Sequence, residues 1–244
     1  MRFLAFLWPT LAVLNRNVFA ALRLSVLPVL AAVGVWVAAR SYAPLIGGSA
    51  LHMMAYLLAV LFALCLCYAW FAIRWHRFLL RKETQSALGG SFPPRTLRRY
   101  TLRLFALVAA ILVASFLIAV ITDPGGEMGL PAQWLRYFMV YMASGWVFYR
   151  LSPALAGVPL AQPLTRIEAW RATRGTDFAC LGITFGTFLL TTLLQIPMTP
   201  EGADITPLEP LYITVSFWVQ VLVFTTSVSV VYHATVMAPH PCGE

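Results

Sequence analysis

The residues best suited to chemistry in this chain are hydroxyl and amide side chains within two apolar segments near its C-terminal end. Four of them repeat at helical spacing and form one polar face: Thr184, Thr187, Thr191 and Gln195. They belong to a helix predicted over residues 177–196, and Gln220 lies in the next apolar segment, residues 211–238. Such a face either forms hydrogen bonds between neighbouring helices or lines a polar path through them. The sequence leaves both interpretations open.

A second candidate is a single charged side chain that the sequence places inside an apolar segment. Arg136 lies about one helical turn from the predicted outer end of residues 132–149. A charge in the membrane interior is costly, and it commonly marks a pathway or a partner. Arg136 therefore either extends to the outer lipid headgroups, pairs with an external acid, or binds an anion beside the polar face.

Residue patterns that would make an enzyme or a metal site are missing from the sequence. Four histidines are spread along the chain: His52, His76, His233 and His240. None has a histidine or an acid at metal-ligand spacing on the same helix, so we interpret them as polar residues of the membrane interface. No Gly-x-Ser-x-Gly, phosphate-loop or nucleotide-binding pattern occurs. We therefore expect no catalytic residue, no metal site and no cofactor.

Composition places these residues in a membrane. Hydrophobic residues make up 60% of the 244 residues and charged residues only 11%, whereas soluble domains carry about a quarter charged residues. We predict one all-α integral membrane domain over residues 1–244, a transmembrane helix bundle of six spans. The predicted spans are residues 24–39, 51–73, 100–122, 132–149, 177–196 and 211–238. Residues 1–23 resemble a signal peptide but contain Pro9 and Asn15, and we predict that they stay as an interfacial helix.

A basic stretch between the second and third spans determines the predicted topology. Residues 74–103 hold eight basic residues and one acid, Glu83. Basic loops stay on the cytoplasmic side, so the alternation of six spans puts both termini in the cytoplasm. Seven bases could also contact anionic lipid headgroups or an acidic partner: Arg74, Arg77, Arg81, Lys82, Arg95, Arg98 and Arg99. Because the bases lie beside span ends rather than along one soluble face, we do not expect nucleic acid as a partner.

Two amphipathic helices are predicted on the cytoplasmic surface. Residues 75–80 continue the second span beyond the headgroups, and Pro94 can open the helix that leads into the third span. The second surface helix is predicted over residues 166–174. Thr165 and Glu168 form a capping box at its start, and Gly175 follows its last turn.

A faint internal repeat is also present. Arg74 and Arg150 each close a predicted span and lie 76 positions apart. The same shift relates Arg98 to Arg174, each of which precedes a span. The pattern predicts two similar hairpins packed side by side, unless the two matches are chance.

Two groups of short motifs resemble a family of membrane proteins. One is Trp75-His76-Arg77-Phe78-Leu79-Leu80 followed by Leu97-Arg98-Arg99; the other is Arg150-Leu-Ser-Pro-Ala-Leu with Ile167-Glu168-Ala169-Trp170 and Thr173-Arg174-Gly175. Over residues 74–177 the chain is similar to uncharacterised inner-membrane proteins of alphaproteobacteria and to the membrane domain attached to some glycerophosphodiester phosphodiesterases. The resemblance implies a multi-pass protein of the bacterial inner membrane and leaves its function open.

Two functional hypotheses follow. The first is a non-catalytic accessory or assembly subunit of a larger membrane complex, because the sequence has no catalytic or cofactor pattern. The alternative is a small permease or lipid-handling protein with a polar path between the last two spans. Packing distinguishes them: an accessory subunit should be packed solid between its spans, whereas a permease should have a cleft lined by Thr187, Thr191 and Gln220.

Overall fold

The computed structural model describes residues 2–43, 49–83, 92–122, 130–195 and 209–238, and these ranges form an all-α fold. A 3-10 turn, η1 (Arg2–Leu4), comes first. The helices that follow are α1 (Leu7–Arg16), α2 (Val18–Tyr42), α3 (Ala50–Arg81), α4 (Pro94–Thr122), α5 (Leu130–Leu151), α6 (Pro153–Ala156), α7 (Arg166–Ala172), α8 (Asp177–Gln195) and α9 (Glu209–Tyr232). A π-helical turn, His233–Met237, extends α9.

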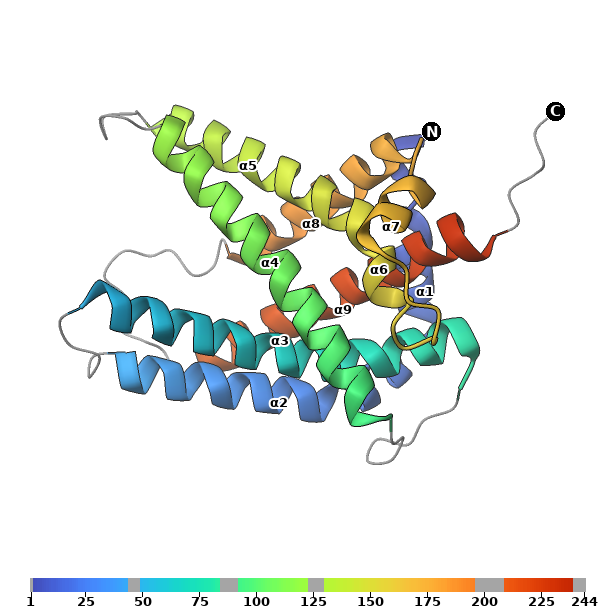
Figure 1. The fold of residues 1–244 in the computed structure, drawn as a ribbon, viewed down its shortest axis with the longest axis horizontal. Helices are drawn as coiled ribbons and strands as arrows, with labels where there is room; N and C mark the ends of the chain where they lie inside the picture. Colours follow the sequence, from blue (N-terminus) through green and yellow to red (C-terminus); the bar gives the residue numbers. More distant parts are fainter. Residues whose placement is uncertain (1, 44–48, 84–91, 123–129, 196–208, 239–244) are drawn as a thin grey trace.

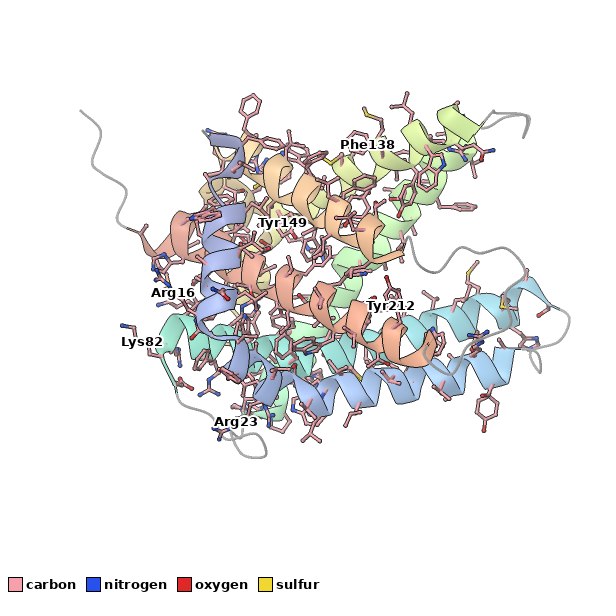
Figure 2. The ribbon with its side chains drawn as sticks, turned by 180° about the vertical axis from the view of Figure 1, so that it is seen from behind. Arg16, Arg23, Lys82, Phe138, Tyr149 and Tyr212 are labelled. Atoms are coloured by element: carbon pink, nitrogen blue, oxygen red, sulfur yellow. The ribbon has the colours of Figure 1, made fainter. Side chains whose placement is uncertain are left out.

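The long helices form two pairs that diverge from one end of the molecule. Figure 1 shows α2 and α3 side by side along the lower edge, while α4 and α5 rise away from them. From behind, α8 and α9 lie between the two pairs (Figure 2). We call the end of the bundle where α3 ends and α4 begins the basic end. It also carries α1, α6 and α7 (Figure 1).

Five helical segments are long and apolar enough to cross a membrane, as expected for a multi-pass membrane protein. They are Val18–Tyr42, Ala50–Arg81, Pro94–Ile118, Asp177–Leu194 and Thr214–Met237. They correspond to five of the six predicted spans, with most of the helices extending beyond the predicted ends. The remaining prediction, residues 132–149, falls within the helix α5, which is not among the five. Its polar and aromatic side chains, Gln133, Arg136 and Tyr137 among them, lower its mean hydropathy.

The N-terminal segment packs against the last two long helices. Both η1 and α1 contact α8, and α1 also contacts α9. Two glycines of α8 make room for it: a Cβ at Gly182 would lie 1.7 Å from the Phe3 carbonyl oxygen, and one at Gly186 would lie 2.7 Å from Leu7 Cδ1. Glycines four residues apart in an apolar helix allow such close approach. The spacing of Gly182 and Gly186 is the feature of the sequence that points to this contact.

The predicted capping box is confirmed at the start of α7. The Thr165 hydroxyl accepts a hydrogen bond from the Glu168 backbone N–H at 3.2 Å, and the Glu168 carboxylate accepts one from the Thr165 backbone N–H at 2.7 Å. The hydrogen bond from the Thr165 backbone N–H to the carboxylate is the main cause that lowers the pKa of Glu168. Gly175, which was predicted to follow the last turn, has φ 82°, in the left-handed region that glycine favours. The helix itself ends at Ala172, two residues before the predicted end, and α4 begins at Pro94 as predicted.

The helices α5 and α8 approach each other closely at Gly145. A Cβ on this residue would lie 2.3 Å from Thr184 Cγ2, and Thr184 is itself buried. We expect Gly145→Ala to push the two helices apart and to lower the free energy of unfolding by roughly 1–3 kcal/mol. Thermal unfolding can be followed with a thiol-reactive dye in a Cys242→Ser background, because Cys65, Cys67 and Cys180 are buried.

Gly34 of α2 is a matched control for this prediction. A Cβ added there meets no atom within 4 Å. Gly34→Ala should keep or raise the unfolding midpoint, since alanine favours a helix more than glycine does. If the two substitutions lower the midpoint equally, the loss does not come from the contact between α5 and α8.

Candidate functional site

A cavity of about 390 Å³ lies between α3, α4, α5, α8 and α9. Apolar side chains make most of its wall, including Leu64, Leu104 and Phe224. Polar groups enter the wall at a few positions: Tyr68, Tyr141, Ser144, Thr187 and Gln220. The cavity opens to the surface of the bundle, and its size and largely apolar wall make it a candidate binding site.

The predicted polar face contributes one of its four residues to this cavity. Thr187 lines it, as does Gln220 from α9, whereas Thr184 packs on Gly145 and Thr191 is half-buried elsewhere on α8. The Gln195 side chain lies outside the described residues. Arg136 is half-buried near the start of α5 and is not among the residues that line the cavity. The cavity therefore combines two of the predicted path residues with apolar walls from α3 and α4.

The hydroxyl groups on this part of α8 donate to the backbone of their own helix. Thr184 Oγ1 donates to the Cys180 carbonyl at 2.8 Å, and Thr187 Oγ1 donates to the Thr184 carbonyl at 2.8 Å. The Thr187 oxygen can still accept a hydrogen bond, and the amide of Gln220 can donate or accept. The chemistry of the wall thus suits a mainly apolar molecule that carries one polar group.

Hydrogen bonds between side chains join three walls of the cavity towards the basic end. Trp75 Nε1 donates to Thr226 Oγ1 at 3.0 Å, joining α3 to α9. His76 Nδ1 lies 2.7 Å from Ser229 Oγ on α9, and His76 Nε2 lies 3.0 Å from the Tyr100 hydroxyl on α4. His76 is fully buried. Its ring is thus held between three helices, and its interpretation as a polar residue of the membrane interface stays a prediction.

The second motif group has a structural explanation at Arg150. This buried guanidinium forms an ion pair with Asp177 and donates to Thr173 Oγ1 at 3.0 Å and to the Trp170 carbonyl at 2.9 Å. It also lies 4.1 Å from the centre of the Trp170 ring and 5.7 Å from that of Trp146. Arg150 thus joins the end of α5 to α7 and to the start of α8.

The seven bases predicted to contact headgroups or a partner separate into exposed and buried groups. Exposed side chains on α4 and at the end of α3 are Arg81, Lys82, Arg95, Arg98 and Arg99. Arg77 is half-buried and pairs with Glu83 at 2.8 Å. Arg74 is buried and lies 5.5 Å from the centre of the Trp70 ring, so it does not face the surface with the others.

Together these features define a multi-pass α-helical membrane protein with a largely apolar cavity between its helices. Comparisons of the chain with protein-family models, characterised proteins and solved structures find no match. The resemblance to the membrane domain of some phosphodiesterases therefore stays a prediction. Among the described residues, no three His, Cys, Asp or Glu side chains come together as a possible metal site.

Proposed function

We propose that this protein handles a lipid or another lipophilic molecule within a bacterial inner membrane, as a small permease or lipid-handling protein. The observation that carries the proposal is the cavity of about 390 Å³. Ligand sites commonly measure about 300–1,000 Å³ and combine apolar walls with a few polar groups. Thr187 and Gln220 are those polar groups here, and they belong to the two helices named in the permease hypothesis.

The proposal includes the six-span arrangement with both termini in the cytoplasm. Its support is the gathering of Arg77, Arg81, Lys82 and the first turns of α4 at the basic end, which would be the cytoplasmic face. In this arrangement α5 is the additional span, although it is less apolar than the other five. Its aromatic residues Trp134 and Tyr137 suit the opposite membrane interface.

We rank the accessory-subunit hypothesis below the lipid-handling one because of how the helices pack. It predicts helices packed solid against one another, and the cavity between five of them favours the alternative. Co-purification in a mild detergent decides between them. A stoichiometric protein partner would support the subunit role, and a retained small molecule without a partner would support lipid handling.

The experiment that tests the proposal fills the cavity. Leu64→Trp combined with Val108→Trp adds bulk to opposite walls, on α3 and α4. We expect mass spectrometry of the purified protein to show a bound lipophilic molecule, and we expect its occupancy to fall at least tenfold in this variant, a cost of about 1.4 kcal/mol. The exposed Leu58 of α3 provides the control, since Leu58→Trp places the same ring outside the cavity.

Transport is tested separately from binding. In vesicles, dithionite bleaching of a fluorescently labelled phospholipid measures movement between leaflets. Replacing Thr187, Thr191 and Gln220 by Val, Val and Leu should abolish any movement that the unchanged protein catalyses. An unchanged rate in this variant, or equal occupancy in the filled and unfilled cavities, would contradict the proposed function.

A further inference from the structure

Three hollows follow one side of α4, and together we call them the groove. It begins at the basic end as a hollow of about 580 Å³ lined by Arg95, Arg99 and Arg103. An adjoining hollow of about 200 Å³ shares Arg103 and adds Arg166, the first residue of α7. The groove continues between α4 and α5 as a third hollow of about 240 Å³, which shares Arg166 and Leu107 with the second. Neighbouring hollows of the groove thus share lining residues, and the third also shares Ile111 and Ser144 with the cavity.

The sequence of α4 gives this groove two chemically different halves. Three arginines and then three alanines follow one another along one side of the helix at intervals of three or four residues: Arg95, Arg99, Arg103, Ala106, Ala110 and Ala114. Residues at this spacing lie one above the other on a helix. On the facing helix, Ala143 and Val147 complete the apolar half.

Hydrogen bonds from Arg103 hold the basic half of the groove in place, and they leave Arg99 and Arg166 exposed. Arg103 donates to the Ala154 carbonyl at 2.9 Å and to the Leu164 carbonyl at 3.0 Å, which fixes the connection between α5 and α7 beside α4. Arg99 and Arg166 are exposed on either side of it. Guanidinium groups bind phosphate oxygens with two parallel N–H···O bonds. This half is therefore complementary to an anionic phosphate.

The apolar half has the length of one lipid tail. From Leu107 to Ile118 the helix extends about 17 Å at a rise of about 1.5 Å per residue. One leaflet of a bilayer has a hydrocarbon thickness of about 15 Å, half of about 30 Å. Small side chains along this distance line the hollow between α4 and α5, where the Ser115 and Ser144 hydroxyls, 3.0 Å apart, also join the two helices. An acyl chain along this hollow would lie beside that contact.

We propose that this groove binds one anionic glycerophospholipid of the leaflet at the basic end. The phosphate contacts Arg99 and Arg166, and one acyl chain lies between α4 and α5. The site adjoins the cavity, and Ile111 and Ser144 line both, but Arg99 and Arg166 do not line the cavity, so the site does not require the proposed handling function. Of the seven bases expected to contact headgroups, Arg95 and Arg99 line the groove. Arg166 lines it too, although it was not among the seven.

Photo-crosslinking tests the site in the full-length protein. The protein is reconstituted in phosphatidylcholine vesicles with a trace of phosphatidylglycerol that carries a diazirine in its acyl chain, below saturation. We expect adducts on Ala106, Ala110, Ala114 and Val147, which line the groove and not the cavity. Arg99→Gln with Arg166→Gln should lower this labelling about 25-fold, since each arginine near an anionic lipid contributes about fivefold.

A matched variant separates the site from general surface charge. Arg98→Gln with Arg171→Gln removes one charge from each of the same helices, and neither residue lines the groove. Labelling should change less than twofold in this control. Equal labelling by the phosphatidylcholine form of the probe, or an equal loss in the two double variants, would overturn the proposal and leave only non-specific attraction to the membrane surface.

Discussion

Replacing Arg150 by alanine should lower the free energy of unfolding by about 3 kcal/mol, the largest loss we expect from a single side chain. The substitution removes the ion pair with Asp177, the hydrogen bonds to Thr173 and Trp170, and the contact of the guanidinium with two tryptophan rings. It therefore detaches α7 from α5 and α8. The unfolding midpoint should fall by roughly 6–12 °C for a chain of this size.

Two further variants show whether the geometry of Arg150 matters rather than its charge alone. Arg150→Lys keeps the charge but lacks the planar fork that reaches Asp177 and Thr173 together, so it should recover only part of the loss. Arg171→Ala removes an exposed arginine from α7 and should change the midpoint little. A full recovery with lysine, or a midpoint unchanged by alanine, would contradict the role that the structure gives to Arg150.

Local sequence features predicted helix ends better than they predicted contacts. Pro94, the capping box at Thr165 and Glu168, and the turn at Gly175 all act through neighbouring backbone groups, and all three are found as predicted. The first span was predicted to begin after Arg23, whereas α2 already begins at Val18. An arginine near a membrane surface does not end a helix, because its long side chain can extend to the headgroups.

The cavity and the buried histidine could not be predicted in the same way. His76 lies 153 positions from Ser229 and 24 positions from Tyr100 in the chain. Helical periodicity shows which face of a helix is polar, but it does not show which other helix lies opposite. Thr187 and Gln220 were selected from such a face, whereas the apolar walls from α3 and α4 depend on how five helices come together.

The structure adds one matched contact to the internal repeat of 76 residues, an arginine that lies over a tryptophan ring. Arg74 lies over the ring of Trp70, and Arg150 lies over that of Trp146, in each case the tryptophan one helical turn earlier. These two tryptophans are themselves related by the shift of 76 positions. The two pairs of helices, α3 with α4 and α5 with α8, are also in contact. The surroundings of the two arginines nevertheless differ. Arg150 also lies against a second ring, that of Trp170 on α7. The repeat therefore stays a prediction.

Replacing His76 by leucine should lower the free energy of unfolding by about 2 kcal/mol, the second largest loss we expect. Leucine makes neither the contact with Ser229 nor that with Tyr100, and the Tyr100 hydroxyl loses its histidine partner in a buried position. The midpoint of thermal unfolding should fall by roughly 4–8 °C. His52 lies on the same helix and is exposed, so His52→Leu is the matched control.

A double-mutant cycle attributes this loss to the hydrogen bond rather than to the shape of the side chain. Tyr100→Phe removes the hydroxyl group that His76→Leu would leave without this partner, so the double variant should lose less stability than the two single losses added together. The same bond holds α3 and α4 together beside the cavity, and the contact with Ser229 adds α9. We therefore expect His76→Leu also to weaken retention of the lipophilic molecule. Additive losses in the cycle would show that the two side chains do not act as a pair.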